Sequence, residues 1–386
     1  MKRSTLFSTA VATLFAASSA YAAQNVANTS QKGSLLVWPL INVDQTAPNG
    51  YDTMVELSND ANATVHVECE YVNEEKGRVN FDFDLTAKAT ASWDVFTLAG
   101  DHVNPPPFPA NAGNPPFPGN AHRGELICFA TDPGRQFQIA WNELIGTATV
   151  IRQDPGDSQP RQGFKYNAWS FATRCAINTT TCTSGLARDD NTVSQGKPGA
   201  LSLSGANAAG AYDGCPVYNI ANFMPNGATL GNVKTVDNWL SVVSCNQDLR
   251  ETYKIHATKL DFTVWNSNEN SFTGAYACVD SVVSLPLGSA RQPSPPAVVQ
   301  ASNFDFSTVG TPNARFQVRG GAHTPPCPFP TENTGLLGVV QSGVALTGDS
   351  GVDQDIGNTT QTAGIFTPAG FVLWDVSIAP PAKPSH

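Results

Sequence analysis

The chain has 386 residues, a formal net charge of −10 at pH 7 and only 14% charged residues. An acidic chain without a basic cluster argues against nucleic acid and anionic lipid as partners, because both require a concentrated cationic surface. Its length is too great for one small core, so two domains are expected.

The N-terminus has the pattern of a secretory signal peptide. Lys2 and Arg3 precede an apolar stretch at residues 6–17, and Ala20-Tyr21-Ala22 fits a small-residue cleavage site. We therefore predict a signal peptide at residues 1–22 and no transmembrane segment in the mature chain. The expected location is extracellular or on the cell surface, otherwise periplasmic.

Eight cysteines follow the predicted signal, none of them in a C-x-x-C motif. An even count in an exported chain predicts four disulfides, for which 105 connectivities are possible. Metal ligation is the alternative, but the cysteines do not have the spacing that is usual for metal ligands.

Alternation of apolar and polar residues predicts an all-β chain. At residues 64–72, Val65, Val67, Cys69 and Tyr71 share one face, as in a half-buried strand. The turn residues 59–62 predict that this strand forms a hairpin with residues 53–57. Further strands are predicted at residues 34–43, 78–85, 91–98, 124–130, 137–141 and 148–152. Short strands at this spacing indicate an antiparallel, immunoglobulin-like β-sandwich.

Residues 173–234 are rich in Gly, Ala, Asn, Ser and Thr, which predicts a loop-rich connection tied down by disulfides. Strands are predicted again at residues 240–244, 260–265, 275–283, 315–319, 336–346 and 370–378. The expected organisation is one sandwich at residues 23–172, the connection, a second sandwich at residues 235–378, and a disordered Pro-rich tail at residues 379–386.

The two strand-rich regions share an order of features: a hairpin, a Cys, a Pro-Phe-Pro segment, a second Cys and a Leu-x-Gly strand. This order predicts an internal duplication. The alternative is coincidence, because β-sandwiches in general share such an order of features. A duplication predicts equivalent bridges Cys69–Cys128 and Cys278–Cys327. The remaining cysteines would then pair as Cys175–Cys182 and Cys215–Cys245.

Several short motifs resemble a group of uncharacterised secreted β-rich proteins of environmental Gram-negative bacteria. They are KGSLL at residues 32–36, the segment 59–69, GELIC at 124–128, KYNAW at 165–169, CNQDL at 245–249 and WNxNExxFTGAY at 265–276. The resemblance implies an exported protein and no catalytic residue.

Candidate catalytic and metal-binding patterns are weak. GDSG at residues 348–351 matches the nucleophile run of trypsin-like proteases, but no triad partner segment accompanies it, so a turn is the better interpretation. Asp349, Asp353 and Asp355 can offer oxygens to calcium in one loop, although not at EF-hand spacing. The histidines are scattered. The carboxylates available for a hydrolase pair are Glu68, Glu70, Asp82, Asp84, Glu125 and Glu143.

Aromatic residues offer binding surfaces. Phe108, Phe117 and Phe329 lie in Pro-Phe-Pro segments, which either dock a partner or glycan or cover a sheet edge of their own domain. The seven tryptophans can stack on sugars, but their apolar flanks assign most of them to the core.

The sequence therefore predicts a non-catalytic, exported surface-structural or adhesive protein, with assembly as an extracellular subunit as one form of this function. No cofactor is expected other than calcium. Its partners would be further copies of itself, another surface protein or a glycan. A secreted glycan- or peptide-binding module is the first alternative, and a carboxylate-dependent hydrolase is the second. Fold alone does not choose among these classes.

Overall fold

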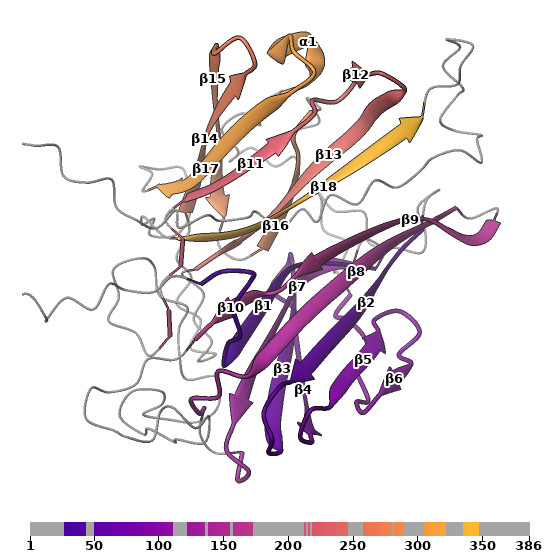
Figure 1. Ribbon diagram of the computed structural model, residues 1–386, viewed down its shortest axis with the longest axis vertical. Coiled ribbons are helices and arrows are strands. Elements are labelled where there is room, and N and C mark those ends of the chain that lie inside the picture. Colours follow the sequence, from indigo (N-terminus) through magenta and orange to yellow (C-terminus); the bar gives the residue numbers. More distant parts are fainter. Residues whose placement is uncertain are drawn as a thin grey trace, which may run out of the picture.

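The computed structural model describes residues 27–43, 50–110, 122–135, 138–154, 157–172, 212–213, 215–216, 218–245, 258–279, 282–288, 304–321 and 335–346. These residues are nearly all β, as the sequence predicts, and form antiparallel sheets in two stacked groups (Figure 1). The predicted signal peptide, calcium loop, residues 370–378 and tail lie outside them.

The first group is a sandwich of two antiparallel five-stranded sheets. One sheet has the order β10 (Trp169–Phe171), β1 (Leu35–Val43), β7 (His122–Thr131), β3 (Val65–Asn73) and β4 (Arg78–Leu85). The other has the order β6 (Gly100–Asp101), β5 (Thr90–Asp94), β2 (Gly50–Asn59), β8 (Leu144–Asp154) and β9 (Asp157–Asn167). Buried side chains from both sheets, including Trp38 and Trp93, form one core between them.

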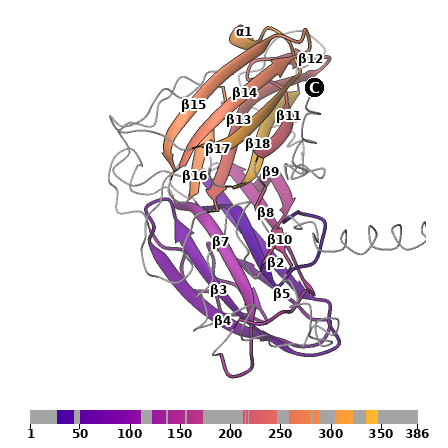
Figure 2. The ribbon, with the colours of Figure 1, turned by 90° about the vertical axis from the view of Figure 1, so that its left-hand side faces the viewer.

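The second group also packs two sheets face to face. One has the order β11 (Tyr218–Phe223), β17 (Ala314–Gly321), β14 (Thr258–Asn266) and β15 (Ser271–Val279). In the other, β13 (Val233–Ser244) pairs with β12 (Thr229–Leu230), β16 (Val282–Pro286) and β18 (Leu336–Leu346). A short helix, α1 (Phe306–Val309), precedes β17. Figure 2 shows β15, β14 and β17 side by side in the upper half of the molecule.

The two sandwiches share a core through β1. Every residue of β1 is buried, which explains why this strand is a continuous apolar run and not an alternating one. Leu36 and Trp38 face the core of the first sandwich, whereas Leu35 and Val37 belong to the cluster that contains the core of the second. Trp169 adds a hydrogen bond across the seam, with its Nε1 3.2 Å from the carbonyl oxygen of Gly338.

Two predicted disulfides are confirmed. Cys69 and Cys128 are direct register partners on adjacent strands β3 and β7, with Cα atoms 4.1 Å apart. This bridge therefore lies within one sheet, unlike the bridge between sheets of immunoglobulin domains. Cys215–Cys245 ties the residues before β11 to the end of β13. The predictions for Cys175–Cys182 and Cys278–Cys327 fall on side chains outside the described set.

The predicted hairpin at residues 53–72 is wrong. Strand β2 pairs with β5 and β8, whereas β3 pairs with β4 and β7 in the opposite sheet. Residues 60–64 therefore cross from one sheet to the other. Asn59 holds this crossing, because its Nδ2 donates to the carbonyl oxygens of Ala63, Leu85 and Thr86. Turn-forming residues suit a hairpin and a crossing equally, so composition alone could not distinguish them.

The duplication is not confirmed. The segment matched to residues 53–72 does form a hairpin in the second sandwich, where β14 pairs directly with β15. The predicted connection at residues 173–234 also ends too late, since β11, β12 and the start of β13 lie inside it. Asn219, Ala221 and Asn222 obscured the apolar pattern of β11, a strand that is held in place by pairing with the distant strand β17.

Candidate functional site

The outer side of the sheet β11-β17-β14-β15 carries the candidate site, which we call the Trp265 face. Strand β14 alternates strictly, with Leu260, Phe262 and Val264 buried and Trp265 on the opposite, partly exposed side. The Trp265 face is made of Tyr218, Ile220 and Asn222 from β11, Arg315, Gln317 and Arg319 from β17, Lys259, Asp261, Thr263 and Trp265 from β14, and Ser271, Thr273 and Ala275 from β15.

The register sets these side chains in rows across the sheet. Trp265 lies opposite Arg315 on one side and Ser271 on the other. In the next row of this face, Thr263 lies between Gln317 and Thr273. The two rows thus place hydroxyl and amide groups beside the indole of Trp265. Such groups can form hydrogen bonds with sugar hydroxyls, while the indole offers an apolar contact.

Trp265 differs in placement from the other described tryptophans. Four of them are completely or almost completely buried: Trp38, Trp93, Trp141 and Trp169. Trp239 is partly buried, with the guanidinium of Arg123 from the first sandwich 4.9 Å from its ring centroid. Trp265, in contrast, lies on the outer side of its sheet, and the Arg315 guanidinium carbon is 4.8 Å from its ring centroid. Trp374 lies outside the described ranges.

The turn after Trp265 fixes the position of the indole. Asn266 Oδ1 accepts hydrogen bonds from the backbone N–H groups of Asn268 at 3.0 Å and Asn270 at 2.9 Å. Glu269 takes the left-handed conformation that closes the turn, with φ of 64°. Asn266 Nδ2 donates to the carbonyl oxygen of Val309 at 2.8 Å, which connects this turn to α1 just before β17. One buried amide therefore holds both strands that carry the Trp–Arg pair.

The opposite end of the face is partly neutralised. Lys259 Nζ lies 2.7 Å from Asp261 Oδ1, so these two charges balance each other. Gly321 lies beside this pair, and a Cβ atom there would be 2.9 Å from Asp261 Oδ2. Among the described residues, neither Arg315 nor Arg319 has a carboxylate at ion-pair distance, and both are exposed.

Phe108, predicted as a binding residue, is buried in the first core. Its ring packs edge-on against Tyr71, with centroids 5.2 Å apart. Asn73 Nδ2 donates to the carbonyl oxygens of Pro109 and Ala110, which anchors the Pro-rich segment. This placement matches the alternative interpretation, in which the segment covers its own domain. Phe117 and Phe329 lie outside the described ranges.

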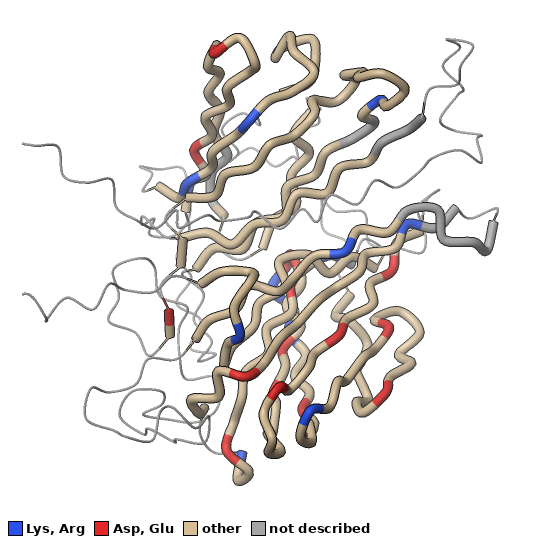
Figure 3. Tube along the Cα trace, in the orientation of Figure 1, with Lys and Arg blue, Asp and Glu red and all other residues tan. Residues whose placement is uncertain are grey.

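The six carboxylates considered for a hydrolase lie mainly on β3 and β4, and most have a basic neighbour. The ion pairs are Glu70 with Arg78 at 3.0 Å, Asp82 with Arg135 at 3.0 Å, Asp84 with His66 at 2.6 Å and Glu143 with Lys32 at 2.7 Å. Figure 3 shows how densely acidic residues occupy the first sandwich compared with the second. Four of the six carboxylates therefore have a basic partner, and Glu68 and Glu125 are not among these four.

One carboxylate pair escaped the sequence analysis. Asp52, which is buried, and Asp94 both accept a hydrogen bond from the Phe96 backbone N–H, at 3.2 and 3.0 Å. Burial, and then the charge of Asp94, raise the pKa of Asp52 to about 7. Asp94 also accepts from the Thr97 N–H at 2.7 Å, so this pair holds the loop after β5 against β2.

No group of three or more His, Cys, Asp or Glu side chains within the described ranges is placed to hold a metal ion. Asp349, Asp353 and Asp355 lie outside these ranges, so the calcium loop stays a prediction. In the part of the chain that the structure describes, no helix is long and apolar enough to cross a membrane.

The Trp265 face had a signal in the sequence. In residues 259–265, Trp265 is in phase with Asp261 and Thr263 and out of phase with the apolar residues. Arg315, Gln317 and Arg319 alternate in the same way. Judging the tryptophans by their apolar flanks, instead of by their phase, gave no reason to single out Trp265.

No protein-family model matches the chain, and no curated protein matches it significantly. Among solved structures, the exported protein XepA of PBSX is similar over 77% of this chain and 84% of its own, at 7% identity and a TM-score of 0.16. A 7S globulin of Momordica charantia is similar over 75% of this chain and 70% of its own, at 9% identity and a TM-score of 0.13. Scores this low carry no argument about fold or function.

Proposed function

We propose that this protein is a non-catalytic, exported adhesive protein that binds carbohydrate through the Trp265 face. The observation that carries the proposal is the Trp265–Arg315 pair on the outer side of a sheet. The part of the indole that Arg315 leaves exposed offers apolar contact to a sugar ring, and the surrounding hydroxyl, amide and guanidinium groups bind its hydroxyls.

The rigidity of the face supports this function. Its side chains project from strands, and the sheet beneath them packs on a core that includes Phe262, Phe316 and Val318. A site built on strands loses little entropy when a ligand binds, because its geometry exists beforehand. The two confirmed disulfides suit a protein that works in an oxidising compartment outside the cytoplasm.

The test is affinity electrophoresis of the mature protein through gels that contain one polysaccharide each, neutral or acidic. Binding retards migration, and the Trp265→Ala variant is expected to lose the retardation. Phe96→Ala is the matched control, because Phe96 is an aromatic residue 49% exposed on the first sandwich. Equal retardation of the wild type and Trp265→Ala on every bound polysaccharide would refute the proposal.

Assembly is a second candidate function, favoured by the edge strand β15. Among the described residues, β15 pairs only with β14, and it contains no charged residue and no proline. The edge strands β4 and β9 of the first sandwich, in contrast, carry charges, and β9 also carries Pro160. Natural sheets use charge and proline to block edge-to-edge pairing, so β15 is the least protected of these three edges.

Light scattering after size exclusion tests assembly. We expect oligomers of the wild type and loss of these oligomers in Ala275→Lys, which places a charge in the middle of β15. Asn80→Lys at the middle of the β4 edge is the control. A wild type that remains monomeric at all concentrations would exclude this candidate.

A further inference from the structure

We infer that the ligand of the Trp265 face is an acidic polysaccharide whose uronate carboxylates are bound by Arg315 and Arg319. This inference rests on the proposed carbohydrate-binding function and narrows it to one class of glycan. Its basis is the local charge of the face and the geometry of strand β17.

The charge of the face is opposite to that of the whole chain. The chain has a formal net charge of −10. On the face, Asp261 forms an ion pair with Lys259 and is also the register partner of Arg319, so the four charged groups Lys259, Asp261, Arg315 and Arg319 together have a net positive charge. The overall negative charge opposes the approach of an anion, so the attraction of an anionic ligand depends on this local patch.

The two arginines are arranged to bind an extended anionic chain. They are four residues apart on one strand and therefore on the same side of the sheet, about 13 Å apart from Cα to Cα. Gln317 lies between them on this side and can both donate and accept hydrogen bonds. A linear polymer lying along β17 would thus meet a cation, an amide and a second cation in succession.

Guanidinium groups suit carboxylates in particular. The planar fork of Arg donates two parallel hydrogen bonds to a carboxylate, which a Lys ammonium cannot do. Arg315 is further held in place by the Trp265 ring beneath it. Two such cations are too few for the multiple phosphate contacts of nucleic acid, whereas they match carboxylates spaced along a sugar chain.

The experiment measures binding of the mature full chain to polygalacturonate and to the same polymer with its carboxylates methyl-esterified. We expect the unesterified polymer to bind at least tenfold more tightly, with an affinity that falls as salt rises from 50 to 200 mM. Arg319→Gln is expected to weaken this binding about tenfold to a hundredfold, as the loss of a charge-assisted hydrogen bond requires. Arg135→Gln, which removes an exposed arginine from the first sandwich, is the control and should bind like the wild type.

The outcomes separate this inference from the proposed function. Equal binding of both polymers, lost in Trp265→Ala but not in Arg319→Gln, would overturn the uronate inference and leave carbohydrate binding intact. Binding to neutral polysaccharides alone would overturn it in the same way. A wild type that binds no polysaccharide would overturn both. Arg315 and Arg319 are exposed and form no ion pair among the described residues, so their variants should keep the fold; unchanged melting temperatures would exclude unfolding as the cause.

Discussion

Arg315 lies over the indole of Trp265, 4.8 Å from guanidinium carbon to ring centroid, on the outer side of the β11-β17-β14-β15 sheet. The two residues are register partners on adjacent strands, so the contact follows directly from strand pairing. An exposed cation–π contact stabilises a fold by only about 0.5–1 kcal/mol. Its placement on an accessible face therefore has more consequence for binding than for stability.

Asp52 makes stability depend on pH. Its folded pKa of about 7 lies above the ordinary value of 3.8, so the folded state holds this proton more tightly than the unfolded state does. Its contribution is therefore fully present below about pH 4 and is lost as the pH rises through 7, by an amount on the order of 2–4 kcal/mol. Urea denaturation at pH 4.5 and pH 8 should show this decrease, and Asp52→Asn should flatten it. An unchanged pH dependence in Asp52→Asn would contradict the assignment.

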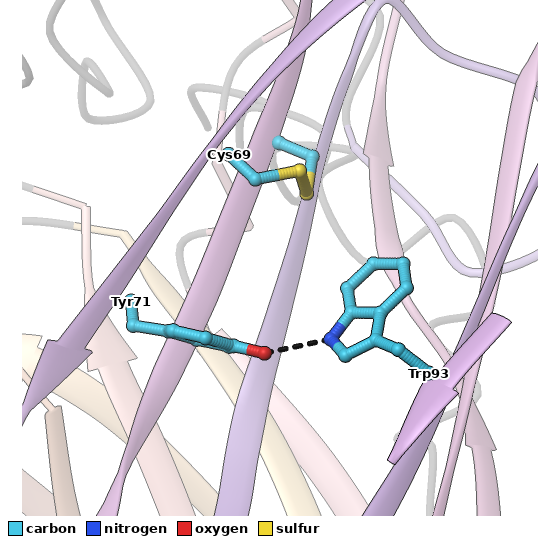
Figure 4. Close-up of a disulfide and its surroundings, with 4 residues drawn as sticks. Cys69, Tyr71 and Trp93 are labelled. Atoms are coloured by element: carbon cyan, nitrogen blue, oxygen red, sulfur yellow. Dashed lines mark hydrogen bonds between the residues drawn. A yellow bond between two sulfur atoms is a disulfide. The ribbon is translucent and has the colours of Figure 1, made fainter. Parts of the chain in front are cut away.

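Tyr71 and Trp93 form a buried hydrogen bond between the two sheets of the first sandwich. Trp93 Nε1 donates to the Tyr71 hydroxyl at 2.6 Å, close to the Cys69–Cys128 bridge (Figure 4). Tyr71→Phe leaves the indole N–H buried without an acceptor, which should lower the free energy of unfolding by about 1–3 kcal/mol. Denaturation at constant pH measures this loss; a variant as stable as the wild type would show that the bond contributes nothing.

Gly146 leaves room for the Trp38 ring. A Cβ atom at Gly146 would lie 2.1 Å from Trp38 Cζ2, and Trp38 is completely buried and cannot move aside. Gly146→Ala should therefore destabilise the protein by about 1–3 kcal/mol through overpacking. In a protein that already carries Trp38→Phe, Gly146→Ala should cost less stability than it does in the wild type, because the smaller ring makes space. Strictly additive effects of the two substitutions would argue against the clash.

The shared core predicts that the two sandwiches unfold together. A fragment of residues 23–172 would expose Leu35, Val37, Ile127 and Phe129, all of which are buried against the second sandwich. We expect calorimetry of the mature chain to give one transition and the fragment to bind hydrophobic dyes strongly. Two separate transitions, one of them reproduced by the fragment, would show that the sandwiches are independent.

Sequence patterns predicted strands well where the pattern is local. Residues 78–85 and 336–346 were predicted with their observed bounds, because local alternation or a compact apolar run defines both. Strand β9 was missed, since Pro160 and the polar residues around it conceal a strand that is defined by pairing with β8. The hairpin predicted around Asn59 was wrong for a related reason, because the partner of a strand depends on distant residues.

The candidate site was accessible to sequence reasoning only in part. Glycan binding through tryptophan was considered, but the choice among the tryptophans required the register that brings Trp265 to Arg315. The burial of Phe108 likewise depends on Asn73 holding the Pro-rich segment from a distant part of the chain. Such long-range contacts leave no local pattern.

Hydroxyl-radical footprinting of side chains, with and without saturating polygalacturonate, tests carbohydrate binding by the Trp265 face most directly. The account predicts that oxidation of Trp265 and Tyr218 decreases when the polymer is bound. Met54 and Phe96, which are 39% and 49% exposed on the first sandwich, should be oxidised equally in both states. Protection of Met54 or Phe96 with Trp265 unchanged would contradict the account and assign binding to the first sandwich.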